Sequence, residues 1–418
     1  MILQGWPTVP FVRRGFRTVL CRACACVILA ALLGAGELAR AEPPNLEIWL
    51  EDVKAEAARK GLTGDAVSEA LARVKYLDRV VELDRRQPEL TQTFWKYIDA
   101  RITPGRIADG QEYLNAYESL LNEVYQRYGV QPRVLVALWG LESDYGRSQG
   151  DFEVISAIAT LAFDSRRNSF FRQQLFALLE LMQRGDVPVD VTGSWAGAIG
   201  QPQFMPTTFR DHAIDFDGDG TRNLRDSLPD IFASAAGYLA ASGWTRHASW
   251  GYEVSLPEQF DYMETGLDVE KPVSEWKSMG VRGADGTDLA DSDMKTSLLL
   301  PSGARGPAFL VSRNFRAILR WNNSVLYALA VGHLSDRIAG GGPLLSPRPA
   351  AEVSLTHYDV AEMQSMLTNL GFEPGQPDGI LGDKTRRAIR MFQKSIELPA
   401  DGYPDPALLE QLRGRSVN

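Results

Sequence analysis

The chain has 418 residues, of which 44% are apolar and 23% charged, so it can build hydrophobic cores and is not disordered throughout. Its 44 Lys and Arg residues against 53 Asp and Glu residues give a net charge of −9, which argues against electrostatic binding of nucleic acid. The three cysteines all lie within the first 26 residues, so the rest of the chain has no thiol for catalysis, a disulfide or a cysteine-bound zinc.

The first 41 residues have the pattern of a secretory signal peptide. Arginines precede an apolar run, residues 23–35, and the small-x-small cleavage pattern Ala39-Arg40-Ala41 follows it. The alternative, a membrane anchor, would need a longer apolar run to cross about 30 Å of hydrocarbon. We therefore expect export to the periplasm with cleavage after residue 41, and the sequence leaves the Sec and Tat routes open.

The rest of the chain divides into three parts. Residues 42–338 have mainly helical periodicity, and patterns typical of short strands around residues 245 to 312 predict a minor β element there. A stretch rich in Gly and Pro, residues 339–354, predicts a linker. Residues 355–415 form a smaller unit with apolar positions of its own. The expected fold class is mainly α (α+β), with a minor β element and a small three-helix C-terminal domain.

Two Asp-Gly pairs repeat within the C-terminal unit, at Asp378-Gly379 and Asp401-Gly402. The pair favours a tight turn because glycine adopts positive φ without steric cost. A helical pattern follows each turn, and we expect Asp383 to cap the first of these helices. The repeat predicts a compact helical module.

Residues 131–142 predict a buried helix that ends in a carboxylate, Glu142. Leu138 and Trp139 lie one turn earlier, and their apolar surface together with the negative end of the helix dipole predicts a raised pKa for Glu142. A glutamic acid that is protonated near neutral pH can act as the general acid that cleaves a glycosidic bond. The alternative is an ordinary solvated glutamate at a helix end.

A glycosidase usually needs a second carboxylate across the sugar. Asp144 would point to a nearly opposite side of the helix from Glu142, so we interpret it as a turn residue. Without a partner for Glu142, the sequence favours a mechanism in which the substrate supplies its own nucleophile and Glu142 is acid and then base. A hydrolytic muramidase that activates water with Asp144 or another acid stays the alternative.

Residues 215–226 have the pattern of a calcium-binding loop, with oxygen donors at alternate positions and a glycine at the sixth. The candidate ligands are Asp215, Asp217, Asp219, Thr221, Asp226 and Asp230. Asp226 stands where a bidentate Glu is usual, so either Asp226 or Asp230 is expected to complete the site. We predict one structural calcium ion and no organic cofactor, against the alternative of an acidic surface turn.

Four segments in order resemble the lytic murein transglycosylases of the membrane-bound type B family. They are Trp139–Gly146, Ala157–Phe163, Gly193–Pro206 and Arg320–Tyr327, within a resemblance that covers roughly residues 45 to 338. The resemblance implies a lysozyme-like catalytic core. The tail is similar to the common three-helix peptidoglycan-binding module, with a dimerisation module as its alternative.

The resemblance implies that Glu142 protonates the bond between N-acetylmuramic acid and N-acetylglucosamine and then assists attack by the muramoyl 6-hydroxyl, which yields a 1,6-anhydro sugar. It also implies a glycan groove lined by Ser194, Gln203, Phe204, Tyr238, Trp321, Asn322, Tyr327 and, by a looser alignment, Tyr97. Trp321 stands where the family commonly has a tyrosine, so this position offers an aromatic ring for stacking but no phenol hydroxyl. For Phe204, core packing is the alternative to contact with sugar.

The expected partners are peptidoglycan glycan strands, with other cell-wall enzymes as further candidates, no nucleic acid and a monomeric chain. A protein of a different class would also fit: a catalytically silent, calcium-braced cell-wall adhesin whose tail supplies the affinity. Substitution of Glu142 separates the two, because only an enzyme would lose turnover.

Overall fold

The computed structural model describes residues 45–85, 92–164, 168–349 and 353–416. The chain divides into two units, residues 1–49 and 50–418. The signal peptide predicted over residues 1–41 lies outside the described residues and stays a prediction. Within the part that the structure describes, no helix has both the length and the apolar character needed to cross a membrane.

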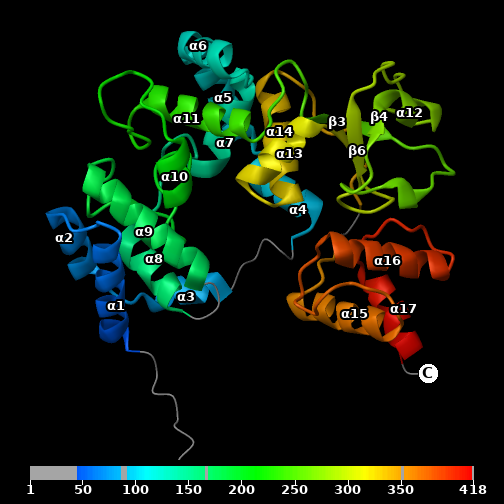
Figure 1. The fold of residues 1–418 in the computed structure, drawn as a ribbon. Coiled ribbons are helices and arrows are strands. Elements are labelled where there is room, and N and C mark those ends of the chain that lie inside the picture. Colours follow the sequence, from blue (N-terminus) through cyan, green and yellow to red (C-terminus); the bar gives the residue numbers. More distant parts are fainter. Residues whose placement is uncertain (1–44, 86–91, 165–167, 350–352, 417–418) are drawn as a thin grey trace, which may run out of the picture. The chain divides into compact units, whose positions relative to one another are not determined.

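The N-terminal half is helical, as the sequence periodicity predicted (Figure 1). In chain order its helices are α1 (Leu46–Arg59), α2 (Asp65–Arg73), α3 (Asp78–Arg85), α4 (Phe94–Arg101), α5 (Pro104–Ala116), α6 (Glu118–Tyr128), α7 (Pro132–Ser143), α8 (Val154–Phe163), α9 (Asn168–Arg184), α10 (Pro206–His212) and α11 (Leu228–Ala241). Two short strands, β1 (Phe152–Glu153) and β2 (Thr192–Gly193), pair antiparallel.

The minor β element is an antiparallel sheet with strand order β4-β6-β7-β3-β5. Its strands are β3 (Gly251–Ser255), β4 (Lys271–Pro272), β5 (Arg282–Gly283), β6 (Lys295–Leu299) and β7 (Ala308–Val311). A short helix, α12 (Val273–Ser278), places the fully buried Trp276 in the apolar core beside this sheet. The minor β element predicted around residues 245 to 312 is confirmed, because all five strands of this sheet lie in that range. Their apolar side chains pack in the core.

The helices that carry the site share one hydrophobic core. Helices α13 (Arg313–Trp321) and α14 (Val325–Ile338) follow the sheet, and α14 packs against α7 and α4. Most residues of α7 and α14 are buried, which is why both sequences are apolar on nearly every side. The fold class, mainly α with a minor sheet and a lysozyme-like core, is confirmed.

The C-terminal module has three helices, α15 (His357–Asn369), α16 (Asp383–Ser395) and α17 (Pro406–Ser416). The two Asp-Gly turns are held in the same way: Gln364 donates to Asp378 and Gln393 donates to Asp401, and each glutamine carbonyl accepts from the following glycine N–H. Both glycines have positive φ, at 74° and 71°, as predicted. The expected cap was wrong by one residue, because the N-cap of α16 is the preceding glycine and Asp383 begins the helix.

The described part of the predicted linker, residues 339–349, contains no helix or strand. Two sets of polar contacts nevertheless hold it in position. The Glu253 carboxylate accepts hydrogen bonds from the N–H groups of Leu345 and Ser346, at 2.7 and 2.8 Å. Arg348 makes a bidentate ion pair with Asp99, so this stretch is anchored to the catalytic region.

Candidate active site

Glu142 lies in the last turn of α7, where the helix is forced to end. Proline at the first helical position starts α7, and two consecutive residues in the left-handed region, Asp144 (φ 50°) and Tyr145 (φ 59°), stop it. Non-glycine residues adopt that conformation at a cost, so the surrounding contacts must hold the turn. Glu142 is partly buried. Its predicted raised pKa stays a prediction.

Two long-range donors hold the Glu142 carboxylate. The indole N–H of Trp321 donates to Oε1 at 2.7 Å, and the hydroxyl of Tyr327 donates to the same oxygen. Trp321 therefore donates a hydrogen bond through its indole N–H at the position where the family commonly has a tyrosine hydroxyl. Trp321 ends α13 and Tyr327 lies in the first turn of α14, so the packing of α14 against α7 brings both donors to Glu142.

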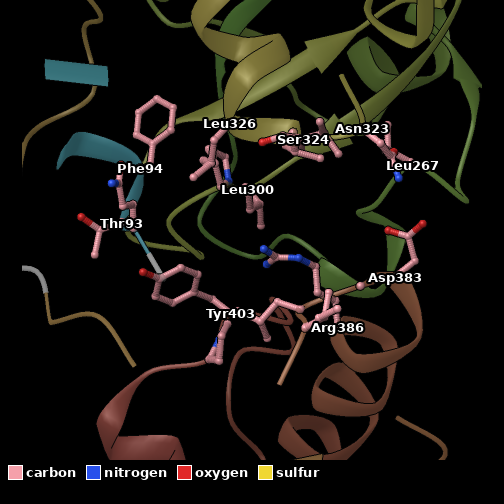
Figure 2. Close-up of a pocket in the computed structure, with 18 of the residues that line it drawn as sticks. Thr93, Phe94, Leu267, Leu300, Asn323, Ser324, Leu326, Asp383, Arg386 and Tyr403 are labelled. Carbon is pink, nitrogen blue, oxygen red and sulfur yellow. The ribbon is translucent and has the colours of Figure 1, made fainter. Parts of the chain in front are cut away.

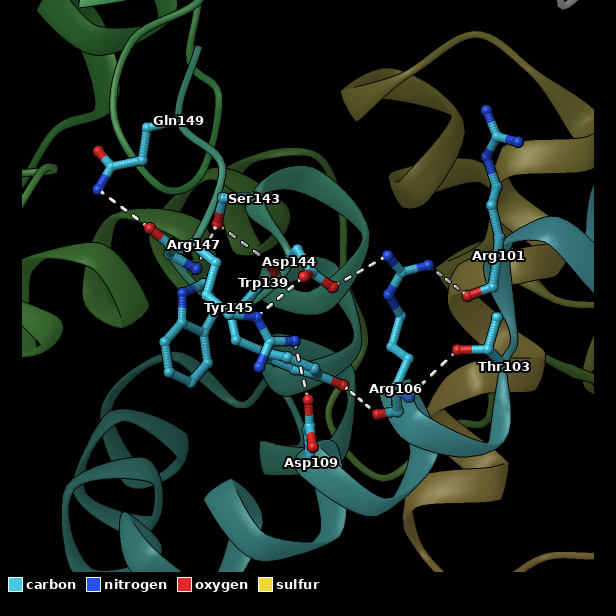
Figure 3. Close-up of polar contacts among 11 residues, drawn as sticks. Arg101, Thr103, Arg106, Asp109, Trp139, Ser143, Asp144, Tyr145, Arg147 and Gln149 are labelled. Atoms are coloured by element: carbon cyan, nitrogen blue, oxygen red, sulfur yellow. Dashed lines mark hydrogen bonds and ion pairs between the residues drawn. The ribbon is translucent and has the colours of Figure 1, made fainter.

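A network of arginines and aspartates fixes the turn after Glu142 (Figure 3). Asp144 accepts from Arg106 at 3.1 Å and from Arg147 at 2.9 Å, and Arg147 also pairs with Asp109 at 2.8 Å. The hydrogen bond from Arg147, supported by the bond from Arg106 and opposed by partial burial, lowers the pKa of Asp144. Asp144 is thus a turn residue, as predicted, with a carboxylate committed to two guanidinium groups.

Tyr145 also stabilises this turn. Its ring is 5% exposed, and its hydroxyl donates to the backbone oxygen of Arg106 at 2.6 Å. Two helical glycines make room for it: a Cβ at Gly140 would lie 2.7 Å from the tyrosine ring, and one at Gly110 would lie 2.7 Å from its hydroxyl. Burial raises the pKa of Tyr145 far above its usual range, so the phenol stays neutral.

The aromatic residues predicted for the groove form a cluster beside Glu142. Trp321 lies 5.2 Å from Phe204 and 5.4 Å from Tyr238, measured between ring centroids. Phe204 is 3% exposed, which agrees with the core-packing alternative. The hydroxyl of Tyr238 donates to the backbone oxygen of Arg320 at 2.6 Å. These contacts hold Trp321 in place, and only Tyr238 and Trp321 keep partly exposed rings.

Two of the polar residues predicted for the groove, Ser194 and Gln203, make hydrogen bonds to the backbone of their own segment. Ser194 accepts from the N–H of Ala198, and the amide of Gln203 donates to the backbone oxygen of Gly200. Asn322 directly follows α13 and is partly buried. Tyr97 is 1% exposed on α4, so its ring packs in the core rather than lining an open groove, a departure from the expected position.

Gln201, a residue that the sequence analysis did not single out, links α7 to the acidic loop of residues 215–226. Its side-chain oxygen accepts from the Trp139 indole N–H at 2.6 Å, and its amide donates to the backbone oxygen of Arg225 at 2.7 Å. Trp139 lies on α7 one turn before Glu142. The only signal in the sequence was the position of this glutamine between Gly200 and Pro202 in a segment of small residues.

The predicted calcium loop brings three carboxylates together, with one oxygen from each of Asp215, Asp217 and Asp230 within 4.8 Å of the others. Asp230 is fully buried on α11, and burial raises its pKa although two backbone N–H groups donate to it. The other acidic candidates, Asp219 and Asp226, lie outside this group, and the Thr221 hydroxyl donates to Asp219. Between the two residues expected to complete the site, the geometry therefore favours Asp230.

Comparison with known proteins gives matches over both parts of the chain. The transglycosylase SLT domain family matches residues 45–336, and the putative peptidoglycan binding domain family matches residues 356–412. The chain is 31% identical over 313 residues to membrane-bound lytic murein transglycosylase B of Escherichia coli (strain K12), across 72% of this chain and 84% of that protein.

Solved structures agree with these matches. SltB3 from Pseudomonas aeruginosa, in complex with NAG-anhNAM-pentapeptide, is 46% identical with a TM-score of 0.86, and the match covers 89% of this chain and 100% of that one. Lytic transglycosylase Slt35 of Escherichia coli, in complex with calcium, is 30% identical with a TM-score of 0.60, over 72% of this chain and 94% of that one. The resemblance predicted from four sequence segments is confirmed. The chain belongs to the lytic murein transglycosylase family, the peptidoglycan-cleaving lyases, and carries a C-terminal peptidoglycan-binding domain.

Proposed function

We propose that the protein cleaves the β-1,4 bond between N-acetylmuramic acid and N-acetylglucosamine, with Glu142 as the only acid and base, and leaves 1,6-anhydromuramoyl ends. The observation that carries this proposal is the pair of hydrogen bonds from Trp321 and Tyr327 to one oxygen of Glu142. Two donors on one carboxylate oxygen orient the group, so a proton on the other oxygen can be presented to the glycosidic oxygen.

In the first half of the reaction, Glu142 gives its proton to the glycosidic oxygen as the bond to C1 of the muramoyl sugar breaks. Negative charge then forms on the Glu142 carboxylate, and the donors on Trp321 and Tyr327 stabilise that charge. In the second half, the muramoyl 6-hydroxyl attacks C1 and its proton passes to Glu142. The bond between O6 and C1 closes the anhydro ring, the acid is regenerated, and no water is consumed.

The state of Asp144 argues against the hydrolytic alternative. A general base must accept a proton from water, but hydrogen bonds from two arginines lower the pKa of this carboxylate and occupy its oxygens. Asp144 also lies in a left-handed turn beyond the end of α7, not across a sugar from Glu142. Its role in this mechanism is to hold the turn that positions Glu142.

The test is product analysis from purified sacculi with the wild type, Glu142→Gln and Glu123→Gln. Glu123 is an exposed glutamate on α6, so its substitution is the matched control. We expect the control to release anhydro ends at the wild-type rate and Glu142→Gln to lose at least about 100-fold in rate. Digestion in ¹⁸O-labelled water separates lyase from hydrolase, because only hydrolysis puts the label into the product. Labelled reducing ends would contradict the proposal.

We also propose that Asp215, Asp217 and Asp230 hold one structural calcium ion. Calcium takes carboxylate oxygens at about 2.3–2.6 Å, so oxygens bound to one ion can lie up to about 5 Å apart, and the spacing within 4.8 Å fits. Three carboxylates this close repel one another without a cation. The complex of Slt35 with calcium supports the same choice of ion.

Such an ion would brace the active site without taking part in the chemistry. The loop reaches Glu142 through one chain of hydrogen bonds, from the backbone oxygen of Arg225 to Gln201 and from Gln201 to Trp139 on α7. Calcium should therefore raise the melting temperature of the wild type. Asp217→Asn should abolish this rise, whereas Asp226→Asn, outside the carboxylate group, should keep it. The reverse pattern would show that Asp226 completes the site.

The substrate requires export, because peptidoglycan lies outside the cytoplasmic membrane. We propose a periplasmic protein whose first 41 residues are removed as a signal peptide, and N-terminal sequencing of the protein from the envelope fraction tests this. An N-terminus upstream of residue 41 would contradict it. Binding to other cell-wall enzymes and the monomeric state stay predictions.

A further inference from the structure

The two Asp-Gly turns of the C-terminal module are held by the same set of contacts. Gln364 holds the first turn, Asp378-Gly379, and Gln393 holds the second turn, Asp401-Gly402. In each turn, Oδ1 of the aspartate also accepts from the backbone N–H two residues later, at 2.9 Å. Each glycine lies against a backbone oxygen in the first turn of the preceding helix, where a Cβ would come as close as 2.6 and 2.9 Å. The two turns are therefore equivalent in structure, and the contacts of one indicate what the other can bind.

The second turn holds a peptide segment of the catalytic region. The other oxygen of its aspartate, Asp401 Oδ2, accepts from the backbone N–H of Ala304 at 2.8 Å. Gly303 allows this approach, because a Cβ there would lie 2.8 Å from Asp401 Oδ2 and 2.9 Å from Cβ of Tyr403. Tyr403 directly follows the turn and lines a cavity together with Leu300 of the catalytic region (Figure 2). The second turn thus binds a backbone N–H through its carboxylate and packs a large side chain beside it.

The first turn presents the equivalent groups to solvent. Asp378 is exposed, and no described residue makes an ion pair with its carboxylate or a hydrogen bond to its Oδ2. Ile380 stands where the second turn has Tyr403, and 42% of its surface is exposed. A carboxylate oxygen accepts hydrogen bonds only, so an acceptor beside an exposed apolar side chain suits a ligand with an N–H donor and an apolar part.

We propose that the first turn binds the peptide part of peptidoglycan, with Asp378 Oδ2 accepting from a peptide N–H and Ile380 packing against the ligand. This inference rests on the substrate named in the proposed function. The second turn is the argument for a peptide, because there a backbone segment passes at a glycine and offers its N–H to the equivalent carboxylate. The match of residues 356–412 to the putative peptidoglycan binding domain family supports peptidoglycan as its source. Both residues lie in the C-terminal module, so the site would hold the enzyme on the wall rather than position the bond that is cut.

The test measures how tightly the full chain binds purified sacculi in a pull-down, with Glu142→Gln as the background so that no turnover occurs. Asp378→Asn in this background is isosteric, so it keeps an oxygen to hold the turn and replaces the exposed acceptor by an amide donor. It should weaken binding about tenfold, the usual effect of losing one charge-assisted hydrogen bond. Glu373→Gln removes an exposed carboxylate from the same segment and should change the affinity less than twofold.

Competition then separates the peptide from the glycan. Stem peptides released by an amidase should displace the part of the binding that Asp378→Asn removes, and peptide-free glycan strands should not. Ile380→Ser changes an exposed side chain and should weaken binding about threefold, which keeps the test decisive if Asp378→Asn unfolds the module. Unchanged affinity in the folded variants, or displacement by glycan strands alone, would overturn the inference. Failure of the proposed function would appear instead as wild-type digests without anhydro ends, because the binding assays involve no turnover.

Discussion

The hydroxyl of Tyr327 offers the sharpest test of how the fold supports Glu142. Tyr327→Phe removes one oxygen atom and leaves a ring that is only 6% exposed in its core position. The lost interaction is a hydrogen bond to the carboxylate that forms when Glu142 gives up its proton. Hydrogen bonds to charged groups contribute about 1.5–3 kcal/mol. At about 1.4 kcal/mol per factor of ten, kcat should fall about 10- to 100-fold.

The measurement is the initial rate of anhydro-muropeptide release from purified sacculi, quantified by mass spectrometry at saturating substrate. Tyr252→Phe is the matched control, because its hydroxyl has no hydrogen-bond partner among the described residues and it lies on β3, away from Glu142. The double variant Tyr327→Phe with Trp321→Phe should lose less than the product of the two single losses, since both donors share one oxygen. Wild-type kcat in a correctly folded Tyr327→Phe would refute the role assigned to these donors.

Two further predictions concern the turn after α7. Asp144 has a folded-state pKa below its usual value of 3.8, so its ion pairs stabilise the fold above that pH and the contribution disappears as pH falls through the folded value. Asp144→Asn should therefore lower the free energy of unfolding by about 1 kcal/mol or less at pH 6, a value discounted for solvent screening. The loss should shrink as the pH falls below 3.8, and a loss that stays the same down to acid pH would contradict this. Gly140→Ala should destabilise the protein by about 1–3 kcal/mol because the new Cβ meets Tyr145. Gly105→Ala in α5 is the control, because no atom lies within 4 Å of its Cβ position, and it should be neutral or slightly stabilising. Thermal melts of both variants measure the difference, and equal melting temperatures would refute the packing argument.

Local patterns in the sequence were enough to place the main elements. The pattern of residues 131–142 predicted α7 with Glu142 at its end, and patterns typical of short strands predicted a sheet between residues 245 and 312. The Asp-Gly pairs predicted the two turns of the C-terminal module. These signals act over a few residues, because caps, turns and side-chain periodicity depend on neighbours in the chain. The same local reasoning misplaced the cap of α16 by one residue, since a helix boundary depends on small differences between adjacent caps.

The sequence by itself therefore determined the helix that carries Glu142, the order of acidic residues in the loop of residues 215–226 and the three-helix tail. Only the tertiary structure decided what surrounds Glu142: Trp321 and Tyr327 reach it from 179 and 185 residues away in the chain. The tertiary structure also buried Tyr97. The physical reason is that such contacts follow from how α13 packs against α14 and α14 against α7, and packing depends on the shapes of whole helices rather than on any short pattern.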